Sequence, residues 1–373
     1  MINMVAPCAM GLESVVSQEL KFLKMQSVRA EDRRVFFEGN MSDMARANIN
    51  LRAADRVLIV LARFNAKTFD ELFENVKALP LENFIGRKDA FPVKGSSLKS
   101  VLHSVPDCQA IIKKAIVSRL NTLYKQQWFE ESGPVKQLQF LILKDEVTLM
   151  LDTSGENLHK RGYRPLTNIA PIKETLAAGI LSLAQLWNKK VLLDPLCGSG
   201  TFLIEGALMA RKVAPGIKRS FAAETFDSTF AEDVGIADLF KLERESARSF
   251  IKNATDFQAF GWDNDPAVVE LARQNSIRAG VEGSIKVELR ELKSFSSNYE
   301  NACIVTNPPY GERLLDVQQA KEICKLLGKV LPKGNISVIT PDKDFEILFG
   351  RKANKRRKLY NGKIECQLYM YLQ

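Results

Sequence analysis

The chain has 373 residues, of which 46% are hydrophobic and 26% are charged. These proportions are typical of a folded protein and argue against a mainly disordered chain. The length predicts about two to two and a half domains, enough to bury a core without disulfide or metal cross-links. The formal net charge of +9 comes from both halves of the sequence and favours a polyanionic partner such as nucleic acid.

Several classes of protein are disfavoured by what the sequence lacks. No apolar run approaches the roughly 20 residues that cross a bilayer, and the first residues do not resemble a secretory signal. The six cysteines show no CxxC spacing, and two histidines are too few for a histidine-rich metal centre. We therefore expect a cytoplasmic protein with no membrane contact and no metal. Neither histidine lies in a recognisable Ser–His–Asp site.

Residues 1–165 mix short strands with amphipathic helices, a pattern typical of the α+β class. The spacing of apolar residues predicts helices over 13–23, 42–51, 69–78 and 108–124. Strands are expected over 35–39, 56–64, 138–143 and 147–151, the last two forming a hairpin.

A polar segment with glycine and proline, 153–170, follows this part and is expected to contain a linker. It carries the cations Lys160, Arg161 and Arg164. Two interpretations of these cations remain open. They belong either to a solvated connector or to a strap that holds phosphates between two domains.

After residue 171, strands alternate with helices. Strands are expected over 191–194, 258–262, 285–289, 302–306 and 336–340, and helices over 171–187, 202–210, 266–279 and 317–330. This alternation predicts a parallel, doubly wound sheet, with residues 211–252 as a long insertion. Near the end, Asn361-Gly362 predicts a type I′ turn between two antiparallel strands. Such a terminal hairpin is expected in methyltransferases.

The first chemical motif is the loop after the strand 191–194. Its sequence is Asp194-Pro195-Leu196-Cys197-Gly198-Ser199-Gly200-Thr201. Ligands of doubly wound sheets bind beyond the carboxyl ends of the strands, where glycines let the backbone approach them. The loop lacks the third glycine of a dinucleotide site and the Gly-Lys-Ser/Thr of a Walker loop, so phosphate binding is the weaker interpretation. A tight turn without a ligand remains the alternative.

The second motif, Gly261-Trp262-Asp263-Asn264-Asp265, ends the next strand. A carboxylate at this place can accept hydrogen bonds from both hydroxyls of a ribose. Asp265 precedes Pro266 and is expected to cap the following helix. We therefore assign the ribose to Asp263.

The third motif, Asn307-Pro308-Pro309-Tyr310, is the most specific element of the sequence. The two prolines make it rigid, so that the side-chain oxygen of Asn307 and the carbonyl of Pro308 are two acceptors in fixed geometry. Two acceptors suit an exocyclic amino group, and accepting its protons directs the nitrogen lone pair towards an electrophile. Tyr310 offers a face on which a base can stack. A plain proline turn is the alternative.

In this order, the segments DPLCGSGTF, GWDND and TNPPYGERL resemble the S-adenosylmethionine-dependent amino methyltransferases of the class I fold. With GENLHKRGYR, APIKETLAAGIL and KRRKLYNGKIECQLY, nearly the whole chain resembles the THUMP-domain RNA methyltransferases. Within them it is most similar to the bacterial 23S rRNA guanine-N2 methyltransferases of the RlmL and YpsC type. The resemblance implies a Rossmann-like methyltransferase domain with a C-terminal antiparallel hairpin, preceded by an α+β ferredoxin-like/THUMP module. The implied boundaries are a ferredoxin-like piece at 1–60, an RNA-binding THUMP domain at 61–155, a linker at 156–170 and the methyltransferase domain at 171–373.

The resemblance also implies roles for residues. The S-adenosylmethionine cofactor, which leaves as S-adenosylhomocysteine, would contact Asp194, Cys197, Gly198, Ser199, Gly200, Thr201, Asp263, Asn264 and Asn307. For the adenine end, the family often places an acid after the strand 285–289, and this sequence departs from that pattern with Arg290-Glu291-Leu292-Lys293, where Glu291 is the candidate. The target amino group would be held by Asn307, Pro308, Pro309 and Tyr310. RNA phosphates would contact Lys160, Arg161, Arg164, Lys355, Arg356 and Arg357. For the last three, a solvated rim remains the alternative.

The expected function is therefore methylation of a guanine N2 amino group in 23S rRNA, by a monomer or a weak homodimer. Three alternatives remain for the substrate or role: a tRNA guanine, an adenine amino group in DNA, and a non-catalytic RNA-binding or ribosome-assembly factor. A cysteine-based C5 methylation through Cys197 or Cys303 is disfavoured, because Cys197 lies in the cofactor loop and Cys303 in a buried strand.

Overall fold

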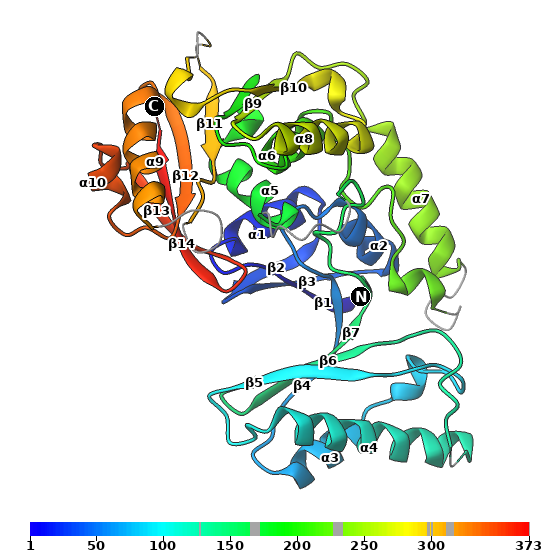
Figure 1. The fold of residues 1–373 in the computed structure, drawn as a ribbon. Coiled ribbons are helices and arrows are strands. Elements are labelled where there is room, and N and C mark those ends of the chain that lie inside the picture. The colour runs from blue at the N-terminus through cyan, green and yellow to red at the C-terminus, as the bar shows by residue number, and fades with distance from the viewer. Residues whose placement is uncertain are drawn as a thin grey trace.

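The computed structural model describes residues 1–126, 128–164, 172–226, 234–296, 299, 301–310 and 317–372. Within them the chain forms two seven-stranded sheets, one from each half of the sequence (Figure 1). None of the described helices is long and apolar enough to cross a membrane.

The first sheet has the strand order β2-β3-β1-β4-β7-β6-β5. Its strands are β1 (Ile2–Pro7), β2 (Gln26–Glu31), β3 (Arg34–Gly39), β4 (Leu58–Asn65), β5 (Val93–Leu98), β6 (Leu138–Leu143) and β7 (Glu146–Asp152). β4 pairs with β1 through Leu58 and Ile59 only, but with β7 along its whole length. The sheet therefore has two parts joined at β4: a part around β1–β3, which with its helices we call the N-terminal lobe, and a part of β4–β7, the middle lobe.

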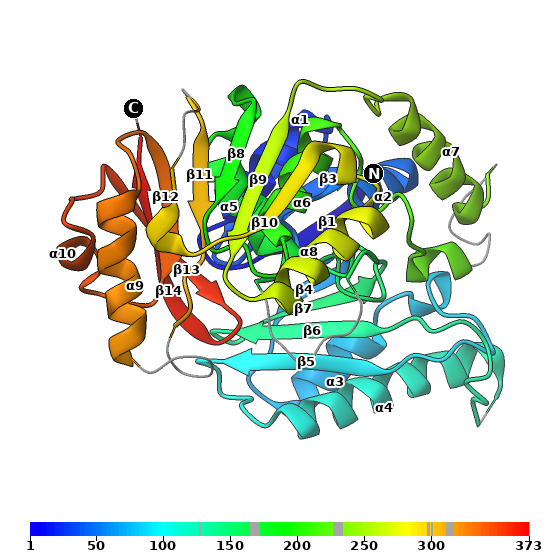
Figure 2. The same cartoon turned by 45° about the horizontal axis from the view of Figure 1, so that its top comes forward.

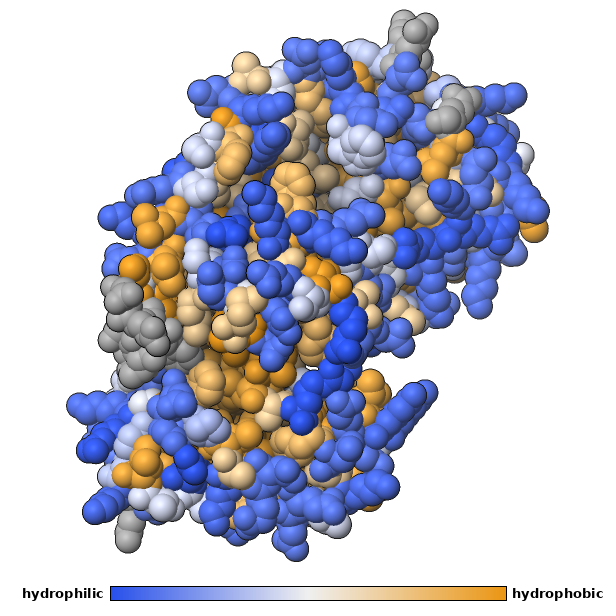
Figure 3. All heavy atoms as spheres, turned by 180° about the vertical axis from the view of Figure 1, so that it is seen from behind, coloured by the Kyte–Doolittle hydropathy of each residue, from blue (hydrophilic) through white to orange (hydrophobic). Residues whose placement is uncertain are grey.

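Four helices cover one face of this sheet. They are α1 (Glu13–Phe22) and α2 (Met41–Asn50) in the N-terminal lobe, and α3 (Phe69–Lys77) and α4 (Val105–Tyr124) in the middle lobe. Two of them begin with capping boxes, in which Asn40 and Asp43 cap α2, and Thr68 and Glu71 cap α3. Seen from behind, hydrophobic residues gather in a hollow between the middle lobe and the rest of the molecule (Figure 3).

The second sheet has the order β10-β9-β8-β11-β12-β14-β13 and belongs to the C-terminal lobe (Figure 2). Its strands are β8 (Val191–Asp194), β9 (Gln258–Asp263), β10 (Ile285–Leu289), β11 (Cys303–Thr306), β12 (Asn335–Thr340), β13 (Lys355–Asn361) and β14 (Ile364–Tyr371). The first five are parallel, and β14 runs antiparallel to β12. The expected doubly wound sheet with a terminal hairpin is confirmed.

Helices pack on both faces of the second sheet. They are α5 (Glu174–Leu183), α6 (Thr201–Ala210), α8 (Pro266–Ala279), α9 (Val317–Val330) and α10 (Phe345–Phe349). Helix α7 (Ile236–Ser249) packs instead against α2 of the N-terminal lobe (Figure 1). Leu192 of β8 faces a core that includes α5, α6 and α8, whereas its neighbour Leu193 faces a core that includes α9 and α10. This alternation is the side-chain period of a strand covered on both sides. The expected start of the first helix, at 171, lies outside the described residues.

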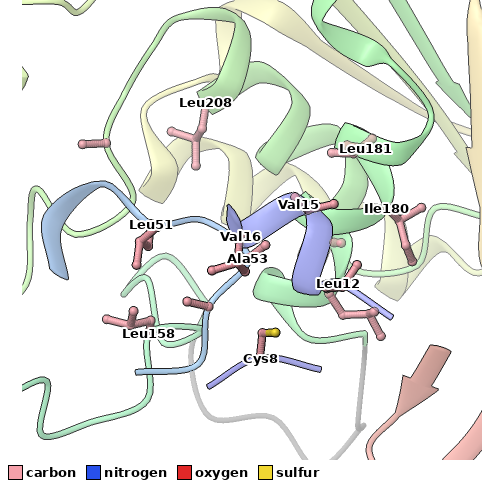
Figure 4. Packing of buried hydrophobic residues seen from close by; sticks show 14 of the residues in the cluster. Cys8, Leu12, Val15, Val16, Leu51, Ala53, Leu158, Ile180, Leu181 and Leu208 are labelled. Atoms are coloured by element: carbon pink, nitrogen blue, oxygen red, sulfur yellow. The ribbon is translucent and has the colours of Figure 1, made fainter. Parts of the chain in front are cut away.

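The N-terminal and C-terminal lobes share one hydrophobic core (Figure 4). Leu12 precedes α1 and packs near Ile180 and Leu181 of α5. The contact is so close that a Cβ atom on Gly179 would lie 2.5 Å from Cδ1 of Leu12. The middle lobe has a separate core, which includes Leu72, Ile116 and Phe140.

The segment expected to be a linker alternates exposed and buried residues over its described part, 156–164. Leu158 is 1% and Tyr163 is 4% exposed, and both belong to the shared core. Residues 165–170 of the expected linker lie outside the described part of the chain. The connector is therefore built into the interface between the lobes rather than separating them.

The terminal hairpin turns one residue later than predicted. Asn361 pairs with Ile364, so the two turn residues are Gly362 and Lys363, and only Gly362, at φ 64°, has a positive φ. A positive φ at the first turn residue alone is the pattern of a type II′ turn, not of type I′. The register places Leu359 opposite Cys366, and both are buried. A one-residue slip would move these side chains to the other face, so packing decides the turn.

Candidate functional site

The three motifs lie together at the carboxyl ends of strands in the second sheet. β8 lies between β9 and β11 and is parallel to both, with Asp194 opposite Gly261 and Leu193 opposite Ile304. The loops that follow these strands therefore all leave the sheet at the carboxyl ends of its central strands. This is the place where doubly wound sheets bind ligands.

The glycine loop has the backbone geometry that its sequence predicts. Gly198 and Gly200 have φ values of 52° and 78°, and Gly200 is the residue before α6. A Cβ atom on Gly198 would meet no atom within 4 Å, so the backbone there borders open space. Ser199 and Thr201 lie on the same loop, with their hydroxyl oxygens 3.2 Å apart. The loop can therefore receive a ligand along its backbone.

Hydrogen bonds join the first two motifs to each other. The backbone N–H of Cys197 donates to the carbonyl of Trp262 at 2.9 Å, and that of Gly198 donates to Oδ2 of Asp263 at 3.1 Å. A Cβ atom on Gly261 would lie 2.9 Å from the sulfur of Cys197. Cys197 is thus a packing residue, 6% exposed, beneath the loop. Burial raises the pKa values of the Cys197 and Cys303 thiols, that of Cys303 to about 12, which further disfavours a thiolate mechanism.

Two acids of the site have different environments. Asp194 is 1% exposed and accepts a hydrogen bond from the N–H of Leu196 at 3.2 Å. Burial raises the pKa of Asp194 to about 7, and the negative charge of Asp263 acts in the same direction. Asp263 is half-buried, and its Oδ1 accepts from the N–H of Asp265 at 3.1 Å. The side chain of Asp265 caps α8 by accepting from Ala267 at 2.8 Å, as predicted.

The Asn307–Tyr310 corner is anchored to the terminal hairpin. The hydroxyl of Tyr310 donates to Oδ1 of Asn307 and accepts from the amide of Asn361 at 3.3 Å. The thiol of Cys366 lies 3.7 Å from the same hydroxyl. Tyr310 is half-buried, and burial raises the pKa of its hydroxyl. A carboxamide oxygen has two acceptor positions, so Oδ1 of Asn307 keeps one for a further donor.

Two residues support the glycine loop through contacts that the sequence does not indicate. Asn275 of α8 is fully buried and donates to the carbonyl of Ser199 at 3.1 Å. Arg164 of the connector donates to the hydroxyl of Thr201 at 3.2 Å and pairs with Glu174 at 2.8 Å. The partners of both residues are distant in the sequence, and only the folded chain reveals them.

The prediction that Arg161 and Arg164 bind RNA phosphates is wrong for Arg161 and unsupported for Arg164. Arg161 is 6% exposed and donates to the backbone carbonyls of Leu158 and Arg52, while its Nε lies 3.7 Å from the buried carboxylate of Glu205. The guanidinium of Arg164 is engaged by Glu174. Arg161 thus links the N-terminal lobe to α6, and Arg164 ties the connector to the C-terminal lobe.

The other predicted contact residues lie at the surface. Lys160 is exposed and pairs with Glu156 at 2.7 Å. On β13, Lys355 is exposed, Arg356 pairs with Glu346, and Arg357 is half-exposed. Glu291 follows β10, with a side chain 60% exposed and 2.5 Å from Lys293. No group of three or more potential metal ligands occurs among the described residues.

The fold and the site define a methyltransferase of the class I architecture. Residues 161–370 match the family model of the RMKL-like methyltransferase domain. Residues 3–58 match the RlmL ferredoxin-like domain, and residues 66–152 match the THUMP domain. The chain belongs to the RMKL-like methyltransferase family.

Relatives extend this likeness to whole chains. The putative RNA methyltransferase YpsC of Bacillus subtilis is 40% identical, over 99% of this chain and 95% of its own length. The ribosomal RNA large subunit methyltransferase K/L of Desulfotalea psychrophila is 31% identical over 97% of this chain and 51% of its own length. The chain therefore spans about half the length of that larger relative.

Solved structures show the same arrangement. A possible methylase from Clostridium difficile 630 superposes with a TM-score of 0.93 at 39% identity, over 100% of this chain and 98% of the other. SMU.472, a putative methyltransferase in complex with SAH, gives 0.90 at 40% identity, over 100% and 98%. A predicted N6-adenine-specific DNA methylase from Listeria monocytogenes gives 0.89 at 42% identity, over 99% and 96%.

Proposed function

We propose that this protein transfers a methyl group from S-adenosylmethionine to the exocyclic N2 amino group of a guanine in RNA, with large-subunit ribosomal RNA as the substrate. The observation that carries the proposal is the position of the Asn307–Tyr310 corner, which leaves the sheet beside the glycine loop and Asp263. A relative named for ribosomal RNA supports the choice of substrate. The protein is proposed to act as a monomer or a weak homodimer.

The residues of the first two motifs fit S-adenosylmethionine. The open space beside Gly198 allows a ligand to lie on the loop backbone, near the carboxylate of Asp194. Each oxygen of Asp263 accepts one backbone N–H and keeps capacity for a ribose hydroxyl. Ser199, Gly200, Thr201 and Asn264 complete the proposed contact set, and Glu291 is proposed for the adenine end. A related structure with bound SAH supports this assignment. When bound, the cofactor supplies an electrophilic methyl group on a positively charged sulfur.

The third motif is proposed to hold the amino group that is methylated. The free acceptor position on Oδ1 of Asn307 and the carbonyl of Pro308 would each accept one N2–H, which turns the nitrogen lone pair towards the methyl group. Pro309 keeps the corner rigid. The ring of Tyr310 would stack on the base, worth about 1–3 kcal/mol. Orientation of the two reactants is expected to supply most of the rate.

RNA is proposed to bind across the middle lobe and the exposed cations of the C-terminal lobe. Lys355 and Arg357 are available for phosphates, whereas Lys160 and Arg356 would have to exchange their pairs with Glu156 and Glu346. Arg161 and Arg164 are omitted, because their charges are used inside the protein. Contacts of this kind position RNA without reading its sequence.

The test is methyl transfer from labelled S-adenosylmethionine to 23S rRNA, tRNA and DNA, with wild-type protein, Asn307→Ala and the matched control Asn253→Ala. Asn253 is exposed and lies outside the site. We expect N2-methylguanosine in digests of 23S rRNA, a loss of at least about 100-fold for Asn307→Ala, and unchanged RNA binding in a gel-shift assay. Undiminished transfer by Asn307→Ala would contradict the role of the corner. Label in tRNA or in DNA adenine would favour the alternative substrates.

A further inference from the structure

A cavity of about 210 Å³ opens beside the Asn307–Tyr310 corner. It is lined by Pro309 and Tyr310 of the corner, by Ala320 and Lys321 of α9, and by Thr340 and Asp342 after β12. The glycine loop does not line it. The cavity therefore lies next to the place proposed for the amino group, and beyond the place proposed for the cofactor.

The corner and the segment 340–342 meet because of the sheet. β11 and β12 are parallel neighbours, with Thr306 opposite Val338 (Figure 2). β11 therefore ends at Thr306, two residues before the level at which β12 ends at Thr340. If a base is held by Asn307 and stacked on Tyr310, the atoms of its edge that Asn307 does not bind would face the segment 340–342.

Asp342 is held in place by three hydrogen bonds. Its N–H donates to the hydroxyl oxygen of Thr340 at 3.2 Å, and its carbonyl accepts from the hydroxyl of Tyr369 at 3.2 Å. Its side-chain Oδ1 accepts from the N–H of Asp344 at 2.8 Å. No donor to Oδ2 and no ion pair of Asp342 occur among the residues that the structure describes. A positioned, half-buried carboxylate oxygen thus remains available at the cavity.

An available carboxylate can distinguish guanine from adenine, because the ring nitrogen next to the amino group is a donor in guanine and an acceptor in adenine. A carboxylate only accepts hydrogen bonds. Guanine presents N1–H, a donor, beside its N2 amino group. Adenine presents N1 as an acceptor beside its N6 amino group, and a carboxylate repels it. A site built to bond a particular N–H strongly rejects an analogue that lacks it.

We propose that Asp342 accepts the N1–H of the target guanine while Asn307 and Pro308 accept its N2–H groups, and that Asp342 thereby selects guanine over adenine. This inference rests on the proposed function. It adds a specificity-determining residue outside the three motifs. It also explains how an Asn-Pro-Pro-Tyr corner, which by itself suits any exocyclic amino group, becomes selective.

The test uses 2-aminopurine, which keeps the amino group of guanine at C2 but lacks O6 and has an acceptor in place of N1–H. Wild-type protein first maps the methylated guanine in 23S rRNA by labelled transfer. Two short RNAs are then made around that position, one with guanine and one with 2-aminopurine. We expect wild-type protein to prefer guanine in kcat/KM by about 10- to 100-fold. Asp342→Asn offers an amide N–H to the acceptor of 2-aminopurine and should reduce this preference to less than about 3-fold.

Asp344→Asn is the matched control, because Asp344 is exposed and its side chain does not line the cavity. It should keep the wild-type preference. A second measurement is binding, and Asp342→Asn should bind the 2-aminopurine RNA more tightly than wild-type protein does in a gel-shift assay.

The outcomes separate the inference from the function on which it rests. Absence of transfer to guanine RNA by wild-type protein would overturn both. Transfer to guanine with equal transfer to 2-aminopurine would overturn the role of Asp342 alone, even if the Asp342→Asn variant did not fold. An unchanged preference in folded Asp342→Asn, with weaker binding of both RNAs, would assign the cavity to another nucleotide and also overturn the inference.

Discussion

The N-terminal and middle lobes share one sheet but differ in what they pack against. The N-terminal lobe has no core of its own, since Leu12, Val16 and Met44 belong to the cluster that also contains Leu181 and Phe202 of the C-terminal lobe. The middle lobe encloses a separate cluster between its strands and the helices α3 and α4. Backbone pairing continues across both lobes, whereas side-chain burial joins them mainly beside β4 and β7, where Leu58 and Met150 form a small cluster with Val5 and Phe36. The units of stability are therefore set by shared cores and not by sheet continuity.

The interface between the N-terminal and C-terminal lobes also contains buried charges. Arg161 and Glu205 lie there, and Tyr163 donates to Glu205 at 3.0 Å. Burial lowers the pKa of Arg52 and raises that of Glu19 at the same interface. Charges that are buried together depend on one another, because removal of one leaves the other without compensation. The predictions below use this difference between the lobes.

The largest effect is expected for Arg161→Ala. It removes one of the cations that compensate the buried carboxylate of Glu205 and should lower the free energy of unfolding by about 3–5 kcal/mol. Urea denaturation measures this change. Lys160→Ala, one residue away but exposed, should change it by less than about 1 kcal/mol. Equal effects of the two substitutions would contradict the structural role of Arg161.

Ile116→Ala should destabilise the middle lobe alone. Ile116 is fully buried in the middle-lobe core, and loss of its side chain costs about 2–5 kcal/mol. Hydrogen–deuterium exchange should increase in β5, β6, α3 and α4. Binding of S-adenosylhomocysteine, measured by calorimetry, should be unchanged. Loss of that binding would show that the middle lobe and the C-terminal lobe unfold as one unit.

Asp194→Asn should change how stability depends on pH. The pKa of Asp194 is about 7 in the folded protein and about 3.9 in an unfolded chain, so between these values only the folded state keeps the proton. Stability is thus lost as pH rises from about 4 to about 7, and the loss is complete above this range. In urea titrations at several pH values, the free energy of unfolding should decline less with rising pH in the variant than in wild-type protein. The difference should be on the order of 1–4 kcal/mol. Parallel pH profiles would refute a raised pKa for Asp194.

The smallest effects are expected from a matched pair of helix caps. Asn40→Ala and Thr68→Ala each remove a capping box, worth about 1 kcal/mol. Binding of S-adenosylhomocysteine should raise the midpoint temperature of the unfolding transition that includes the C-terminal lobe. Asn40→Ala should lower the midpoint of this same transition, because α2 packs in the shared core. Thr68→Ala should affect only exchange in the middle lobe. An effect of Asn40→Ala on the middle lobe alone, or of Thr68→Ala on the transition raised by S-adenosylhomocysteine, would contradict the division into a shared core and a middle-lobe core.

The sequence predicts the second sheet and its three motifs well, because each depends on a few adjacent residues. The strand 191–194, the helix 317–330 and the cap at Asp265 are found where they were expected. β1, β2 and β5 were not predicted. Five of the six residues of β2 are at least partly exposed polar or small side chains, and β5 contains Gly-Ser-Ser, so neither shows a clear apolar alternation.

The roles of single charged residues could not be read from the sequence. Arg161 lies in a polar, basic segment that is typical of a surface, and its burial depends on Glu205 and on the carbonyl of Arg52. Asp342 follows a buried strand without any recognised motif. In both cases the function of the side chain depends on partners that only the folded chain brings near. Local patterns contain no information of that kind.

The first and last parts of the chain touch at Gly11. A Cβ atom there would lie 2.4 Å from the carbonyl oxygen of Lys358 in β13, and the φ of 90° also requires glycine. During synthesis, the N-terminal lobe must therefore wait with an uncovered apolar surface until synthesis has passed β13. Truncated or stalled products will expose that surface and should be prone to aggregate or to recruit chaperones. Expression of the isolated N-terminal lobe is accordingly expected to give insoluble material.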